Sequence, residues 1–344
     1  MEVAPATTLV PSPEAAREAL ARLGIHRVVV PIPFVEEGPV NVYLIEEAGG
    51  GWALFDAGVA TPEGRRALWA GLKALGIEAP EIRRVLVSHG HLDHFGNAAE
   101  LAASGARVFA HPADWNKVSP DAAWSEAREA LYAELFRRLG VDEAGIAALE
   151  ADWERLRVLA HAVPRACLQS LAEGERLRFG RAEAAVLHVP GHTPGHCVLY
   201  FEEAQLMLTA DHLLEHTSPN PVMEPARDSR APRALVSYLA SIRRVREMPV
   251  RWVAPGHGPL WTGHRRHIDR LLGFYQRRQR VLLDALRDRP GLTVDALGAR
   301  LFPRAHASAR FLVLSEVLGN LEVLEEAGRV RRRLAREAWR WEAA

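Results

Sequence analysis

The segment SHGHLDHFG, residues 88–96, places three imidazoles and a carboxylate within six positions. The four side chains are those of His89, His91, Asp93 and His94. On a strand His94 would point away from the other three, and on a helix His91 would lie opposite His89 and Asp93. Neither element brings all four together. The segment is therefore expected to curl as a loop after the apolar strand RRVLV, with Gly90 and Gly96 supplying the conformational freedom.

Three later segments carry similar side chains, each directly after an apolar run that predicts a strand. They are PGHTPGH, LTADHLL and APGHG, and they contain His192, His196, Asp211, His212 and His257. Imidazole nitrogens and carboxylate oxygens suit Zn²⁺ and related divalent ions. Because the four segments offer more ligands than one tetrahedral ion needs, we expect two divalent ions. Zn²⁺ is the expected metal, with Fe and Mn as alternatives.

The order of apolar runs predicts an α+β fold. Three β-rich runs between residues 26 and 58 indicate consecutive antiparallel strands, and residues 61–76 predict a helix with Thr61 as its N-cap. Helical periodicity over about 114–175 indicates a helical insertion, after which strands resume. A strand-rich half, an insertion and a second strand-rich half favour two packed sheets with helices outside.

The C-terminal part has a different composition. Residues 264–344 hold 17 arginines, no lysine and 10 acidic residues, although the whole chain has a net charge of 0. Three predicted helices and a terminal basic hairpin indicate a winged-helix-like unit; a plain three-helix bundle is the alternative. We therefore expect a catalytic domain over 1–263 and a small, mainly helical domain over 264–344.

Length and composition exclude several classes of protein. No run of eighteen apolar residues is present, and the N-terminus does not resemble a signal peptide, so we expect no membrane span and a cytoplasmic location. The zero net charge argues against a general nucleic-acid-coating protein. Neither a GxSxG elbow nor a Walker A loop occurs, which argues against serine hydrolysis and P-loop chemistry.

The motifs HGHLDH, PGHTPGH, the TAD of LTADHLL, and APGHG resemble, in order and strand context, the signature motifs of the metallo-β-lactamase superfamily over residues 25–263. The resemblance implies a four-layer αββα sandwich. It also implies that His89, His91 and His192 bind one ion, that Asp93, His94 and His257 bind the second, and that Asp211 bridges them. Asp56 resembles the family's aspartate that supports a ligand imidazole from behind, and Asp93 would assist proton transfer. His196 lies outside the matched ligand pattern; we expect it to support the ligands or line the pocket, with a merely packed or surface histidine as the alternative.

The resemblance further implies hydrolysis by a hydroxide that bridges the two ions. Asp211 stands where penicillin-degrading members of one subclass have a cysteine, so the chain is more similar to the glyoxalase II, lactonase and phosphodiesterase branches; we expect Cys197 to be a core thiol. We favour a thioester or ester as substrate, that is, a small acyl molecule over RNA.

Two alternatives remain open at this point. The C-terminal unit resembles that of the endoribonuclease β-lactamase-like protein 2, which suggests phosphodiester cleavage, and a non-hydrolytic metal-binding or redox scaffold is the other reading. A homodimer formed through the C-terminal domain is a further expectation.

Overall fold

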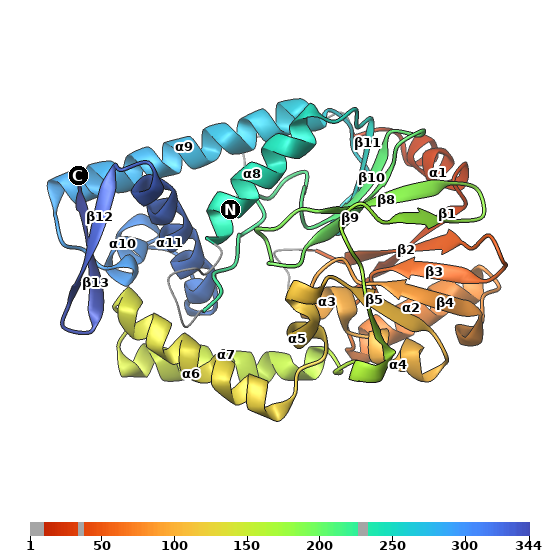
Figure 1. Ribbon diagram of the computed structural model, residues 1–344, viewed down its shortest axis with the longest axis horizontal. Helices are drawn as coiled ribbons and strands as arrows, with labels where there is room; N and C mark the ends of the chain where they lie inside the picture. The colour runs from red at the N-terminus through yellow and green to blue at the C-terminus, as the bar shows by residue number, and fades with distance from the viewer. Residues whose placement is uncertain (1–9, 34–37, 226–232) are drawn as a thin grey trace.

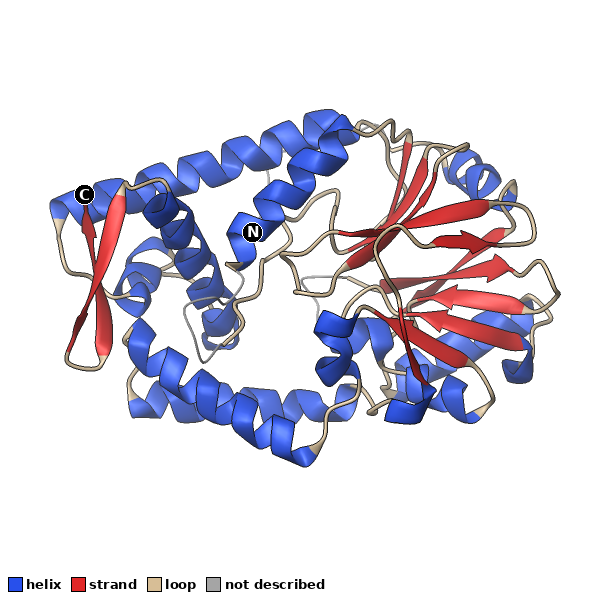
Figure 2. Cartoon of the chain, in the orientation of Figure 1, coloured by secondary structure: helices blue, strands red, loops and turns tan. Residues whose placement is uncertain are grey.

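The computed structural model describes residues 10–33, 38–225 and 233–344. Two β-sheets pack face to face, and helices cover both outer faces, which is the predicted αββα arrangement (Figure 1). The strands of the two large sheets lie in one half of the molecule, and helices with one two-stranded hairpin form the other half (Figure 2). Among the described residues, no helix combines the length and the apolar character that crossing a membrane requires.

The first sheet has the strand order β1-β2-β3-β4-β5-β6. Its strands are β1 Ile25–Val30, β2 Val40–Glu46, β3 Trp52–Phe55, β4 Ile82–Leu86, β5 Arg107–Ala110 and β6 Leu168–Ser170. As predicted, β1 to β3 are antiparallel; from β3 to β6 the pairs are parallel. Strand β2 is buried on both faces, because Val42 and Leu44 face the outer helices while Tyr43 and Ile45 face the second sheet.

The second sheet has the order β11-β10-β9-β8-β7. Its strands are β7 Arg176–Arg178, β8 Glu183–His188, β9 Cys197–Phe201, β10 Leu206–Ala210 and β11 Trp252–Pro255. Side chains of both sheets, among them Phe55 and Phe201, form the central core. Strands β8, β10 and β11 run in the same direction, since β9 is antiparallel to β8 and β10, and β10 is parallel to β11. Their carboxyl ends therefore lie at one edge.

The outer helices bury one apolar face each. They are α2 Pro62–Ala74, α4 Ala98–Ala103 and α8 Ala234–Glu247, whereas α1 Pro13–Ala21 packs through Leu20 against the core between the sheets. Leu68 and Leu72 of α2 pack on the first sheet, and Ile242 of α8 packs on the second. Helix α2 begins as predicted, with the Thr61 hydroxyl accepting from the Gly64 N–H at 3.0 Å. Helix α8 was not predicted from the sequence.

The expectation that residues 88–96 form a loop that depends on the conformational freedom of two glycines was partly wrong. Residues 92–95 form a single helical turn, α3 Leu92–Phe95, and a second short helix, α5 Trp115–Val118, lies nearby. Neither Gly90 nor Gly96 has a positive φ. Glycine is needed there for close approach: a Cβ at Gly96 would lie 2.6 Å from the Gly58 carbonyl oxygen, and one at Gly90 2.7 Å from the Cβ of Lys117.

The helical insertion and the C-terminal unit share one hydrophobic core. The elements concerned are α6 Ala122–Leu139, α7 Glu143–Leu156, α9 His264–Asp288, α10 Val294–Leu301, α11 Arg310–Glu326, β12 Val330–Ala335 and β13 Ala338–Ala343. Phe136 of α6 and Trp153 of α7 each contact Phe311 of α11 edge-on, and they contact each other with tilted rings. The two segments, far apart in sequence, thus form one packed body at the end of the molecule opposite the sheets (Figure 1).

Helix α9 links this body to the two-sheet part of the molecule. Its first half, with Ile268 and Leu271, packs in the core behind the second sheet, and its second half, with Leu282 and Leu286, packs in the core shared with the insertion. Three helices and a hairpin are present over 264–344 as expected. A domain boundary at 263 and a winged-helix function both stay predictions.

Replacing Phe136 with alanine is expected to destabilise the insertion and the C-terminal unit together. Phe136 is fully buried, and such a truncation costs about 3–5 kcal/mol. Hydrogen exchange should then become faster in α11 as well as in α6 and α7. Val281→Ala, at a residue 47% exposed on α9, is the control and should change little. Unchanged protection of α11 in Phe136→Ala would contradict a shared core.

Candidate metal centre

All of the predicted ligands follow the carboxyl ends of strands. The segment with His89 to His94 follows β4 of the first sheet, and the segments with His192, Asp211 and His257 follow β8, β10 and β11 of the second. Because these strand ends meet where the two sheets face each other, side chains that are far apart in the sequence come together. The structure thus brings all seven predicted ligands into one cluster, within which three groups have donor atoms within 4.8 Å of one another.

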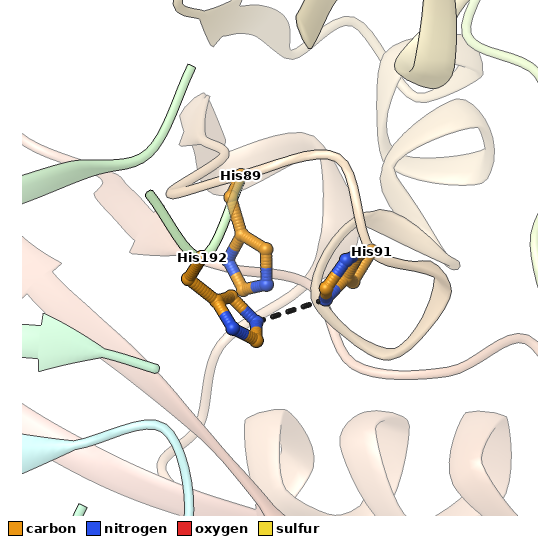
Figure 3. Close-up of side chains that lie close together, drawn as sticks. All are labelled: His89, His91 and His192. Carbon is orange, nitrogen blue, oxygen red and sulfur yellow. Dashed lines mark hydrogen bonds between the residues drawn. The ribbon is translucent and has the colours of Figure 1, made fainter. Parts of the chain in front are cut away.

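The first group consists of His89, His91 and His192 (Figure 3). The His192 Nε2 and the His91 Nδ1 lie 3.0 Å apart, and the His89 ring centroid is 4.6 Å from that of His91 and 4.9 Å from that of His192. His89 and His192 are buried, and His91 is partly exposed. This group is therefore reached by solvent from the side of His91.

The second group consists of Asp93, His94 and His257. The Asp93 Oδ2 lies 3.3 Å from the His257 Nε2 and 3.6 Å from the His94 Nε2. All three side chains are buried. The short helix α3 makes this possible, because its one turn places Asp93 and His94 toward the same cluster although they are adjacent in sequence.

Asp211 lies between the two groups and presents one oxygen to each. Its Oδ2 is 3.5 Å from the His192 Nε2, while its Oδ1 is 3.4 Å from the His94 Nε2 and 3.7 Å from the His257 Nε2. A third group, of His89, His94 and Asp211, spans the boundary. This is the placement expected of a carboxylate shared by two ions.

The donor atoms fit divalent ions in two respects. The Nε2 atoms of His89, His94 and His257 and the Oδ1 of Asp211 are buried and make no hydrogen bond to any described residue. Such orphaned polar atoms are rare in folded proteins unless something else satisfies them. Ligands about 2.0–2.2 Å from a tetrahedral ion lie roughly 3.3–3.6 Å from one another, and the separations given above fall around that range.

Asp56 supports two of the ligands from behind. Its Oδ2 accepts from the His94 Nδ1 at 2.7 Å and from the Ser88 hydroxyl at 2.9 Å, and its Oδ1 accepts from the Ser88 N–H. Since the Ser88 hydroxyl gives its proton to Asp56, it accepts from the His89 Nδ1 at 2.9 Å. Both imidazoles therefore direct Nε2 at the cluster, which is how outer partners orient metal ligands.

Backbone carbonyls orient two further imidazoles. The His192 Nδ1 donates to the Asn220 carbonyl at 2.9 Å, and the His257 Nδ1 lies 3.2 Å from the carbonyls of both Gly38 and Pro39. Each ring again presents Nε2 to the cluster. Four of the five predicted histidine ligands thus have a fixed tautomer in this structure.

The backbone is strained beside the cluster. Asp56 has φ 67° and Ala210, which precedes Asp211, has φ 42°, conformations that non-glycine residues adopt at a cost of order 1–3 kcal/mol. At Gly256 a Cβ would lie 2.4 Å from the Asp211 Oδ1 and 2.9 Å from the His94 Cε1. The first glycine of APGHG, Gly256, is therefore required so that the end of β11 can approach the carboxylate of Asp211.

Asp114 is a supporting residue that sequence analysis missed. It is fully buried after β5, where its Oδ2 accepts from the Gly90 N–H at 2.9 Å and from the Thr193 hydroxyl at 2.5 Å, and its Oδ1 accepts from the Gly195 N–H. One carboxylate thus ties HGHLDH to PGHTPGH. The available signal was its position just beyond the apolar run ARVFA, as with the ligands themselves.

The remaining histidines lie around the cluster or outside it. The His196 ring lies 4.7 Å from that of His89 and 6.0 Å from that of His212, and neither His196 nor His212 hydrogen-bonds a described residue through its ring. His196 therefore packs against a ligand ring without orienting it through a hydrogen bond. His111 stacks on His188 outside the cluster. Cys197 is buried in the core between the sheets.

The two groups differ in their electrostatics. Burial and the neighbouring imidazoles hold the pKa of His89 and of His91 well below the ordinary value. Burial would also lower the pKa of His94 and of His257, but nearby carboxylates, above all Asp211, raise the pKa of His94 well above its ordinary value and that of His257 to about 9. Conversely, His94 and His257 hold the pKa of Asp211 well below its usual range despite burial.

Fold and site together define a metallo-β-lactamase fold with a histidine and aspartate cluster at the strand ends. The chain belongs to the metallo-β-lactamase superfamily, whose sequence profile matches residues 35–257. It is 32% identical over 301 residues to the probable metallo-hydrolase YqjP of Bacillus subtilis (strain 168), which covers 86% of this chain and 90% of that protein.

The chain also resembles proteins of known structure and hydrolases of known name. The metallo-β-lactamase family protein TTHA1429 from Thermus thermophilus superposes with a TM-score of 0.78 at 30% identity, covering 93% of this chain and 99% of that one. A hydroxyacylglutathione hydrolase of Cereibacter sphaeroides (strain ATCC 17029 / ATH 2.4.9) is 29% identical over 174 residues, 50% of this chain and 47% of that protein. The predicted superfamily is confirmed, and the prediction of a hydrolase agrees with the names of these relatives.

Loading the metal-free protein with Zn²⁺ at pH 7 is expected to release protons from the second group. His94 and His257, with raised pKa values, carry protons at pH 7 that ion binding must displace, whereas His89 and His91, with lowered pKa values, are already neutral. About two protons should therefore leave the imidazoles per chain, and one more would leave a water that becomes the bridging hydroxide. Affinity at the second group should rise with pH until the pKa of His257, about 9, is passed.

Titration calorimetry in buffers of different ionisation enthalpy measures this release. His257→Ala is the matched variant: it lacks the proton of His257 and a ligand of the second ion, so His94 should keep its proton and most of the release should be lost. A binding heat that does not depend on the buffer would contradict the assignment.

Proposed function

We propose that this protein is a dinuclear metal-dependent hydrolase, with Zn²⁺ as the preferred ion, that cleaves a thioester or ester of a small acyl molecule. The observation that carries the proposal is the position of Asp211, whose two oxygens face two separate groups of ligands. His89, His91 and His192 would hold one ion, and Asp93, His94 and His257 the other. Two such ions supply a hydroxide at neutral pH and stabilise the negative charge that develops on the substrate.

The side chains of this chain would orient the reaction. Asp93 is held ionised, since His94 and His257 outweigh burial and lower its pKa, so its carboxylate can accept a hydrogen bond from the attacking water and assist its proton transfer, although the lowered pKa makes it a weaker base. His91, the partly exposed ligand, marks the side from which a substrate would enter. The buried Asp56, Ser88 and Asp114 fix the ligand loops before substrate arrives, so little reorganisation is needed.

The acyl substrate is favoured by likeness to the hydroxyacylglutathione hydrolases. That likeness covers about half of each chain, so it supports the chemistry of the centre and leaves glutathione itself outside the proposal. A phosphodiester is the second candidate, favoured by the basic hairpin β12–β13, where Arg332 lies over Trp339 at 4.3 Å. Cationic and aromatic side chains of this kind suit nucleic acids.

Assays of the metal-loaded protein distinguish these substrates. Acyl thioesters, esters, lactones, bis-p-nitrophenyl phosphate and a short RNA would be compared under one set of conditions. We expect thioester or ester hydrolysis, reduced by at least about 10²-fold in His91→Ala, which removes a predicted ligand, and in Asp211→Asn, which removes the negative charge and one oxygen of the bridging side chain. His306→Ala, at an exposed histidine of the C-terminal unit, is the matched control and should retain full activity.

Two results would revise the proposal. Cleavage of RNA or of the phosphodiester, lost in His91→Ala and without acyl hydrolysis, would put the second candidate first. A protein that binds ions at the cluster but hydrolyses none of these substrates, or one that binds redox-active iron, would favour the non-hydrolytic reading.

A further inference from the structure

Residues 218–224, here called the bridging loop, connect the metal centre with the C-terminal unit. The loop follows Asp211 along the chain and has no regular secondary structure, yet most of its residues are buried. Buried backbone groups must find partners, and a segment without helix or strand finds them elsewhere in the fold. The identity of those partners shows what holds the loop in place.

One side of the loop contacts a predicted metal ligand. The Asn220 carbonyl accepts from the His192 Nδ1 at 2.9 Å, and the Val222 N–H donates to the His192 carbonyl at 3.3 Å. The first bond fixes the ring of His192 with Nε2 toward the cluster. The position of a single loop carbonyl therefore sets the direction of this ligand.

The other side is held by the C-terminal unit. The Asn220 side-chain amide donates to the Leu312 carbonyl at 2.9 Å, the Tyr275 hydroxyl donates to the Pro219 carbonyl at 3.0 Å, and the Ser315 hydroxyl accepts from the Met223 N–H at 3.3 Å. Leu312 and Ser315 belong to α11, and Tyr275 belongs to α9. Three bonds within five residues thus hold the loop against one body.

The helical insertion holds the end of the same loop. The Tyr132 hydroxyl of α6 donates to the Met223 carbonyl at 3.0 Å. Glu224 pairs with Lys117 and, at 3.7 Å, with Arg128 of α6. The insertion and the C-terminal unit share a core, so together they act as one rigid support that holds the loop in position.

The other three ligand imidazoles whose Nδ1 is hydrogen-bonded are not held by the bridging loop. His89 and His94 are oriented by Ser88 and Asp56, and His257 by carbonyls that precede β2. All of these partners lie in the segments of the first sheet. Among the described residues, the C-terminal unit therefore supports the first ligand group through His192 alone.

We infer that the C-terminal unit is a positioning element of the metal centre, which sets His192 through Asn220 of the bridging loop. The inference rests on the dinuclear centre proposed above and adds a role for residues 264–344 beyond dimerisation or nucleic-acid contact. Asn220, Tyr275 and Ser315 are positioning residues, since they act through His192. Their loss should weaken the first ion and leave the second unchanged.

The test measures Zn²⁺ affinity at each group in the full-length chain, by competition with a chromophoric chelator. His257→Ala removes a ligand of the second group and so reports the first; His91→Ala reports the second. These two variants serve as parents. Each parent then receives a triple change that deletes the three bonds and keeps the Asn220 carbonyl: Asn220→Ala, Tyr275→Phe and Ser315→Ala. Losing the hydrogen-bond partner of a ligand imidazole typically lowers metal affinity by about 10–100-fold. Because the triple change only loosens such a partner, we expect about a tenfold loss of Zn²⁺ affinity, in the His257→Ala parent alone.

Tyr200→Phe is the matched control, because the Tyr200 hydroxyl donates to the Pro249 carbonyl at 2.8 Å away from the bridging loop. Unchanged affinity in the His257→Ala parent, an equal loss in both parents, or the same loss from Tyr200→Phe would each overturn the inference. The thermal midpoint is followed throughout; the triple change should lower it to a similar extent in both parents, because three hydrogen bonds are lost, so a loss of affinity confined to the first group supports the inference. Parents that bind no ion at all would instead overturn the dinuclear proposal and this inference with it.

Discussion

The carboxylate of Asp211 is the point on which the two halves of this site depend. One oxygen faces His192, and the other faces His94 and His257. A buried carboxylate surrounded by imidazoles is stable as an anion only because those rings balance its charge, and the converse holds for His94. Several nitrogen and oxygen atoms of this network are buried without a hydrogen-bond partner among the described residues. Divalent ions would satisfy those atoms and link the two groups.

The fold serves this arrangement by bringing strand ends together. Two sheets packed face to face place four ligand segments at one edge, and the close approach is achieved at local cost. Ala210 and Asp56 adopt left-handed backbone conformations, and Gly256 leaves space for the Asp211 carboxylate. Asp114 then ties two of the ligand loops to each other. Strain at a few positions is thus offset by hydrogen bonds that a deeply buried site makes strong.

Much of this could be predicted from the sequence, because strand ends and metal ligands leave local signals. Apolar runs followed by His or Asp predicted which side chains meet, and the superfamily motifs predicted the αββα layers. Asp114 and Ser88 were missed because a buried carboxylate or hydroxyl without metal-like spacing resembles an ordinary turn residue. The roles of Gly90 and Gly96 were misjudged because close approach depends on Lys117 and Gly58, which are distant in sequence. The shared core of insertion and C-terminal unit likewise comes from contacts such as that of Phe136 with Phe311.

The central claim is that Asp211 joins two ion sites in a single centre. A crystal structure of the Zn²⁺-loaded protein, with anomalous scattering recorded at the zinc edge, tests it most directly. We expect two peaks about 3.5–4 Å apart, one among His89, His91 and His192, the other among Asp93, His94 and His257, each in contact with one oxygen of Asp211. A single peak, or two peaks that leave Asp211 uncoordinated, would contradict it.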